Sequence, residues 1–253
     1  MHIDRQGSGP DLVLIHGWAM HSGIFAPLVR VLAPHFRLHL VDLPGHGFSR
    51  DESERLELAD SARHIAAATP RAIWLGWSLG GLIALHAALN ETANLRGLVM
   101  AASSPRFVAG GDWPLGIDRA VIEEFSAGLA QDYQRTIERF LALEAIGSDQ
   151  QRNELRDLKA QVFERGEPAM SALTQGLHIL ESADLRADLA RLAVPNLWIA
   201  GRRDRLINPA AMRWAAGQAH GRYLECNSGH APFLAHAAAF ADAIAGFAAE
   251  LPA

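Results

Sequence analysis

Gly76-Trp77-Ser78-Leu79-Gly80 is the stretch of this sequence that decides the fold. It follows an apolar run at 72–75, which is typical of a buried strand, and it precedes residues 82–89, which have the composition of a buried helix. A Gly-x-Ser-x-Gly string between a strand and a helix is typical of a nucleophile elbow, and the glycines let strand and helix pass closely. The stretch therefore predicts a strand, a sharp turn that presents Ser78, and a helix.

Further apolar runs extend this pattern along the chain. They alternate with segments of helical or turn character, which favours a mostly parallel sheet covered on both faces. The fold class predicted is therefore α/β, with a mostly parallel central sheet and helices on both faces. The strands are expected at 12–15, 38–41, 72–75, 95–100 and 196–200, with a weaker one at 222–226.

No apolar run typical of a buried strand is recognised between residues 109 and 184. Apolar residues there recur at steps of three and four, which is the spacing of one helix face: Tyr133, Ile137, Phe140, Leu141 and Ala145. We expect 109–184 to form a helical cap inserted into a core made of 1–108 and 185–253. The alternative is that these residues are simply further core helices.

Composition excludes several classes of function. The chain has 253 residues, of which 49% are hydrophobic, and its net charge is −5. It contains no long Lys/Arg run and no apolar run of about 18 residues, so we expect neither a nucleic-acid partner nor a membrane. The single cysteine, Cys226, and the absence of a secretory signal favour the cytoplasm. No metal, phosphate or dinucleotide motif is present, so no metal or cofactor is expected.

A serine hydroxyl needs a base to accept its proton and a carboxylate to orient that base. His230 lies in a turn-rich loop after the last expected strand, and Asp204 follows the strand at 196–200, so both side chains can reach the carboxyl edge of the sheet. The alternatives for Asp204 are a turn-forming role, or replacement by Asp184 or Asp188. Three other histidines lie in or beside apolar segments and are expected to pack in the interior: His16, His39 and His86.

Acyl transfer also needs two donors for the oxyanion that forms on the substrate. The backbone N–H of Leu79, directly after the serine, is the first candidate. The second is the N–H of Trp18, because the flexible Gly17 before it lets the loop after strand 12–15 turn toward the substrate. The Trp18 side chain is also expected to form a pocket wall.

These motifs together resemble the α/β-hydrolase superfamily, and the match spans the whole core. Within it, the chain is similar to the methyl ester esterases of biotin synthesis through residues 38–45, 72–81 and the cap string 134–143. The motifs that carry the resemblance are Leu14-Ile15-His16-Gly17-Trp18, Asp42-Leu43-Pro44-Gly45-His46-Gly47, Gly76-Trp77-Ser78-Leu79-Gly80-Gly81, Gly201-x-x-Asp204 and Gly229-His230-Ala231-Pro232-Phe233.

The resemblance implies hydrolysis of the methyl ester on a pimeloyl chain carried by acyl-carrier protein, with Ser78, Asp204 and His230 as the triad. The family usually has an amide where this chain has Glu144. The substrate site that the resemblance implies consists of Trp18, Ser78, Leu79, Phe140, Leu141, Ala142, Leu143, Glu144 and His230.

Two arginine pairs in the predicted cap are candidates for docking an acidic carrier protein. Arg135 and Arg139 form one pair, and Arg152 and Arg156 form the other. The spacing of four puts both guanidinium groups of a pair on one helix face. Acidic residues balance the charge of this segment, so an ordinary solvated surface is the alternative. The resemblance favours docking.

The sequence is also compatible with two other functions. One is a broad carboxylesterase or lactonase that uses the same triad on small free esters. The other is a slow or inactive ligand-binding receptor of the same fold, because fold does not fix function. A complete triad with both oxyanion positions argues against the receptor.

Overall fold

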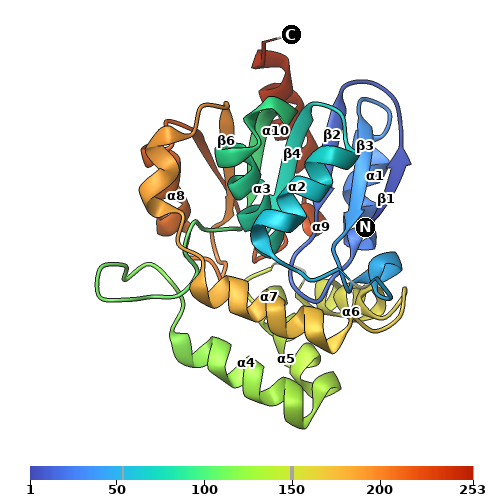
Figure 1. Cartoon of the computed structure of the whole chain (residues 1–253), viewed down its shortest axis with the longest axis vertical. Coiled ribbons are helices and arrows are strands. Elements are labelled where there is room, and N and C mark those ends of the chain that lie inside the picture. The colour runs from blue at the N-terminus through green and yellow to red at the C-terminus, as the bar shows by residue number, and fades with distance from the viewer. Residues whose placement is uncertain (53, 149–150, 253) are drawn as a thin grey trace.

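A parallel sheet with one antiparallel edge strand runs through the centre of the protein (Figure 1). The structure is a computed structural model that describes residues 1–52, 54–148 and 151–252. Within these ranges seven strands form one sheet in the order β1-β3-β2-β4-β5-β6-β7. Their bounds are β1 His2–Gln6, β2 Asp11–Ile15, β3 Arg37–Asp42, β4 Ala72–Trp77, β5 Leu95–Ala101, β6 Asn196–Gly201 and β7 Arg222–Cys226.

All six predicted strands are present, each matched or extended by one or two residues, and they pair in parallel from β3 to β7. β1 was not predicted from the sequence. It pairs antiparallel with β3 at the edge of the sheet, and its His2-Ile3-Asp4-Arg5-Gln6 sequence is mostly polar because much of it faces solvent. An exposed edge strand lacks the apolar run by which buried strands are recognised.

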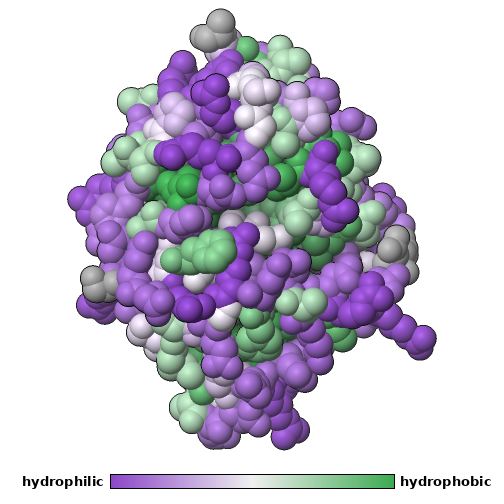
Figure 2. Space-filling view, turned by 90° about the vertical axis from the view of Figure 1, so that its right-hand side faces the viewer, coloured by the Kyte–Doolittle hydropathy of each residue, from purple (hydrophilic) through white to green (hydrophobic). Residues whose placement is uncertain are grey.

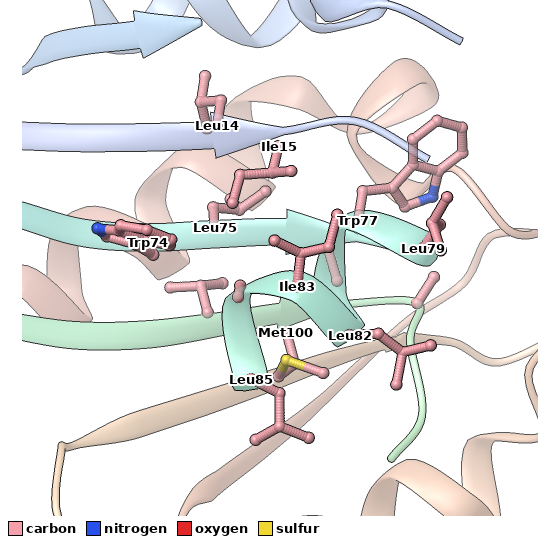
Figure 3. Close-up of a cluster of buried hydrophobic side chains, with 14 of the residues drawn as sticks. Leu14, Ile15, Trp74, Leu75, Trp77, Leu79, Leu82, Ile83, Leu85 and Met100 are labelled. Atoms are coloured by element: carbon pink, nitrogen blue, oxygen red, sulfur yellow. The ribbon is translucent and has the colours of Figure 1, made fainter. Parts of the chain in front are cut away.

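Helices cover both faces of the sheet. α1, α9 and α10 pack on one another on one face, and α2 and α3 pack together on the other, with α8 beside β6 and β7. α3 is almost wholly buried, and its Leu82, Ile83 and Leu85 lie against the strands (Figure 3). The bounds are α1 Ala26–Leu32, α2 Leu58–Ala68, α3 Leu79–Asn90, α8 Pro209–Gln218, α9 Pro232–Ala235 and α10 Ala237–Glu250.

Between β5 and β6 the chain leaves the sheet. The helices of this segment pack on each other and lie across the carboxyl ends of the strands in Figure 1: α4 Arg119–Gln131, α5 Tyr133–Ala145, α6 Gln151–Val162 and α7 Met170–Ser182. The predicted inner face of α5 is buried at Ile137, Phe140 and Leu141. The segment is therefore helical where a cap was predicted, and it covers the edge at which Ser78 stands.

The surface is mostly hydrophilic on the face shown in Figure 2, where hydrophobic residues are scattered. Among the described residues, none of the helices combines the length and the apolar character that crossing a membrane requires.

Candidate active site

Ser78 stands on a strained turn between β4 and α3. Its φ is 54° and its ψ is −120°, a conformation that non-glycine residues rarely adopt. The flanking glycines explain how the turn fits. A Cβ on Gly76 would lie 2.3 Å from the Gly80 carbonyl oxygen, and one on Gly80 would lie 2.3 Å from the carbonyl oxygen of Ile15. The predicted elbow is present, and the glycines are needed for clearance.

His230 and Asp204 form a buried hydrogen-bonded pair. His230 Nδ1 lies 2.8 Å from Asp204 Oδ2, and each side chain is 1% exposed. The other carboxylate oxygen of Asp204 accepts hydrogen bonds from the N–H groups of Leu206 and Ile207, at 2.8 and 3.0 Å. With Nδ1–H directed at Asp204, Nε2 is the ring nitrogen that can accept a proton. Nε2 is buried and has no partner within the described residues.

The three residues all stand at the carboxyl edge of the sheet. Ser78 follows β4, Asp204 follows β6 and His230 follows β7. The indole N–H of Trp77 donates to the carbonyl oxygen of His230 at 2.8 Å, so the residue before the serine also anchors the histidine loop. A Cβ on Gly201 would lie 1.9 Å from the Gly229 carbonyl oxygen, which shows how closely the aspartate and histidine loops pass.

Both predicted oxyanion donors lie beside the serine. A Cβ on Gly17 would be 3.1 Å from the Cβ of Ser78, so the loop that carries Trp18 runs past the nucleophile. Among the described residues, the backbone N–H groups of Trp18 and Leu79 donate no hydrogen bond in the turns, loops and caps. Leu79 is the first residue of α3, where an N–H has no partner within the helix. Both groups are therefore available to bind an oxyanion.

The Trp18 side chain has a separate role as a buried wall. It is fully buried, its indole N–H donates to the Leu173 carbonyl oxygen at 2.8 Å, and its ring meets that of Phe140 edge-on at 4.7 Å. The core loop is thereby fixed to both α5 and α7.

An apolar cavity of about 20 Å³ adjoins Ser78. Ser78 and Phe140 are the predicted site residues that line it. Leu141 and Glu144 are buried elsewhere, while Ala142 and Leu143 are half-buried on α5. The other described lining residues are Phe107, Ile117, Val121, Ile122, Phe125, Leu177, Leu180 and Leu206. Sequence analysis missed them, although Val121, Ile122 and Phe125 have the spacing of one helix face.

Glu144 is buried next to His230 and Asp204. Both of its carboxyl oxygens lack a hydrogen-bond partner in the described part of the chain, and its backbone carbonyl accepts the N–H of His230 at 3.3 Å. Burial raises the pKa of the Glu144 carboxyl well above its ordinary value, and the charges of Asp204 and Glu154 raise it further. This environment favours the protonated, uncharged form of the side chain, which is close in shape and polarity to an amide.

The rivals of Asp204 lie at the surface. Asp184 pairs with Arg186 at 2.7 Å, and Asp188 pairs with Arg191 at 2.8 Å. Neither makes a hydrogen bond to His230. Across the described ranges, no group of three or more His, Cys, Asp or Glu side chains is arranged to hold a metal ion.

The four predicted docking arginines are all exposed on α5 and α6, which pack on each other. Arg139 forms an ion pair with Glu124, and Arg156 lies 3.1 Å from Asp157. The guanidinium groups of Arg135 and Arg152 make no hydrogen bond or ion pair to a described residue. Within the described ranges, two of the four charges therefore have no acidic partner.

The chain belongs to the alpha/beta hydrolase family, whose family model matches residues 12–243. The mostly parallel sheet and the strained turn at Ser78 are those expected of this family. Among its relatives, the pimeloyl-[acyl-carrier protein] methyl ester esterase of Xanthomonas campestris pv. campestris (strain B100) is 56% identical, with all of both chains covered. The enzyme of the same name from Stenotrophomonas maltophilia (strain R551-3) is 55% identical, over 99% of this chain and 97% of that one.

Solved structures show the same fold at lower identity. An esterase from Exiguobacterium antarcticum has a TM-score of 0.87 at 22% identity, over 98% of this chain and 95% of the other. The enol-lactonase from Burkholderia xenovorans LB400 has a TM-score of 0.85 at 21% identity, over 98% and 96%.

Proposed function

We propose that this protein is a serine carboxylesterase that hydrolyses the methyl ester of pimeloyl-[acyl-carrier protein] methyl ester. The products are methanol and pimeloyl-[acyl-carrier protein], for biotin synthesis. The chemistry is supported by the buried His230–Asp204 hydrogen bond at the sheet edge that carries Ser78. The substrate is supported by relatives of that name that are 56% identical over their full length.

Acylation begins when Ser78 Oγ attacks the ester carbonyl and His230 Nε2 accepts the hydroxyl proton. Asp204, held by its own backbone hydrogen bonds, stabilises the resulting imidazolium. The N–H groups of Trp18 and Leu79 donate to the oxyanion. When the tetrahedral intermediate collapses, the imidazolium gives its proton to the leaving oxygen, which departs as methanol.

Deacylation repeats the same steps with water as nucleophile. His230 Nε2 takes a proton from the water that attacks the acyl-enzyme carbonyl, and when the second tetrahedral intermediate collapses, the bond to Ser78 Oγ breaks and the imidazolium gives its proton to that oxygen. The new carboxylate leaves on the acyl chain. No cofactor takes part in this mechanism.

In this proposal residues 109–184 act as a cap over the acyl site. The cavity beside Ser78 has a volume of about 20 Å³ and an apolar lining, which suits methylene groups. A seven-carbon chain is larger than this space, so the side chains of α4, α5 and α7 must move apart to admit it. Burial of the acyl chain then contributes about 0.8 kcal/mol of favourable binding free energy per methylene.

The carrier protein docks, in the same proposal, on the exposed arginines of α5 and α6. Arg135 and Arg152 contribute most, because Arg139 and Arg156 already have acidic partners. Complementary charge mainly accelerates association with an acidic partner. We place the reaction in the cytoplasm, which fits the unpaired cysteine, Cys226.

The deciding experiment compares two substrates on the purified protein. The kcat/KM for pimeloyl methyl ester on acyl-carrier protein should greatly exceed that for the free dimethyl ester, and the gene should restore biotin-independent growth to a strain lacking the esterase. Equal values without rescue would favour a broad carboxylesterase or lactonase. A burst of acyl-enzyme without turnover would favour a ligand-binding receptor.

A further inference from the structure

A second, larger cleft opens beside the triad acid. Its volume is about 480 Å³, and it lies between the loop that leads into α4 and the loop between β6 and α8. The residues that line it within the described ranges are Leu115, Gly116, Ile117, Arg202, Arg203, Asp204, Arg205, Leu206, Asn208 and Pro209. The mechanism above does not use this cleft.

The lining is strongly basic. Arg202 Nε lies 3.5 Å from Glu225, and Arg203 donates to the Asn227 carbonyl oxygen at 3.2 Å, so these two guanidinium groups are anchored. Arg205 is exposed, and its guanidinium group makes no hydrogen bond or ion pair to any described residue. The carboxylate in the lining is Asp204, whose oxygens are occupied by His230 and by backbone N–H groups.

The cleft adjoins the acyl cavity. Ile117 and Leu206 line both spaces, and Ser78 lines the apolar one. A chain whose ester lies at Ser78 can therefore run past these two side chains and place its far end among the arginines. Apolar walls between a nucleophile and a basic cleft suit an aliphatic chain with an anionic end.

We propose that this cleft binds the far carboxylate of a free half-ester of an aliphatic dicarboxylic acid while Ser78 cleaves its methyl ester. This further substrate class rests on the proposed esterase chemistry but not on a carrier protein. The reaction consumes one water and yields methanol and the dicarboxylate. Arginine suits the ligand because its planar fork binds carboxylate oxygens in pairs. The phosphate of a carrier arm fits less well, since a long pantetheine separates it from the acyl chain.

The test compares the monomethyl and dimethyl esters of the same dicarboxylic acid, which differ by one charge. Arg205→Gln should lower kcat/KM for the monomethyl ester roughly tenfold, as expected for loss of one charge-assisted contact, and change the value for the dimethyl ester less than about twofold. Arg205→Lys should retain part of the preference. Arg71→Gln, on an exposed residue before β4, serves as the matched control.

A series of half-esters of increasing length adds a second readout. The distance between Ser78 and the arginines is fixed by the fold, so the monomethyl esters should show a length optimum that Arg205→Gln flattens. Equal loss on both esters, or no loss on either, would overturn the carboxylate site. In that case turnover of the dimethyl ester would still leave the esterase chemistry standing, whereas wild-type protein inactive on all esters would overturn both.

Discussion

The imidazole of His16 holds the carbonyl of the next residue, with Nδ1 2.7 Å from the Gly17 oxygen. The N–H of Leu43 donates to His16 Nε2 at 3.0 Å, so Nδ1 carries the hydrogen and donates it to Gly17. The Gly17 carbonyl and the Trp18 N–H belong to one planar peptide unit. His16 therefore sets the direction of a proposed oxyanion donor. Burial, and then the neighbouring His46, lowers the pKa of His16 to about 3, which keeps the ring neutral.

His16→Ala should lower kcat more than it raises KM. The Trp18 N–H would lose its alignment without being removed, so the loss should be about 10- to 100-fold, below the full cost of deleting an oxyanion donor. Steady-state kinetics on one methyl ester measures both constants. His39→Gln is the control, because His39 is buried on β3 and bonded to Asp11 instead. A change confined to KM would argue against the positioning role.

Ser78→Ala should abolish turnover and leave the fold intact. The hydroxyl makes no hydrogen bond to a described residue, whereas the covalent step depends on it. Activity should fall on the order of 10³-fold or more. Ser61→Ala, at a buried serine of α2, should keep full activity. If the pure Ser78 variant retained more than a tenth of kcat, another residue would be the nucleophile.

Asp204→Asn should reduce kcat by roughly 10³- to 10⁴-fold, because an amide stabilises the wrong imidazole tautomer and cannot balance the imidazolium charge. In the wild type, kcat/KM should fall on acidification, since a protonated ring cannot accept the serine proton. Rate profiles between pH 5 and 8 test both points. A flat wild-type profile would remove His230 from the role of base.

Glu144→Gln should stabilise the protein, and more so at higher pH. The carboxyl pKa in the folded state lies well above its ordinary value of 4.5, so above that pH the unfolded chain releases a proton that the folded protein keeps. Folding stability of the wild type is then lost as pH rises, at about 1.4 kcal/mol per pH unit over the window between the two pKa values.

The amide does not titrate, so the difference between variant and wild type should grow from pH 4.5 upward. Urea unfolding at a series of pH values measures it. Glu123→Gln, at an exposed residue of α4, should show no such trend. A constant difference at all pH values would mean that Glu144 is not held neutral.

Charge reversal of Arg135 and Arg152 should lower kcat/KM for the carrier-bound ester at least several-fold at low salt and less at high salt. A free methyl ester should be nearly unaffected, because these side chains lie on the outer surface of α5 and α6. Arg71→Glu, at an exposed residue before β4, is the control. Equal effects on both substrates would show that the arginines do not dock the carrier.

The sequence alone determined the local elements of this protein. Buried parallel strands have continuous apolar runs, and the elbow at Ser78 needs glycines on both sides, so these features can be recognised within a few residues. β1 could not be recognised in this way, because an exposed edge strand has little apolar content. Ser78, Asp204 and His230 could be selected as candidates because each lies in a turn or loop within four residues of the end of a strand, while their catalytic roles stay predictions.

Only the tertiary structure decided what surrounds the candidate site residues. The cavity wall combines one face each of α4 and α7 with Phe107 and Leu206, which are far apart in the chain. Helix spacing shows that a residue faces inward but not what it meets. The same limit applies to charge: burial and the nearby Asp204 raise the pKa of Glu144, and Arg139 pairs with Glu124, 15 positions away. Burial and electrostatic energies depend on distances that the fold sets between remote residues.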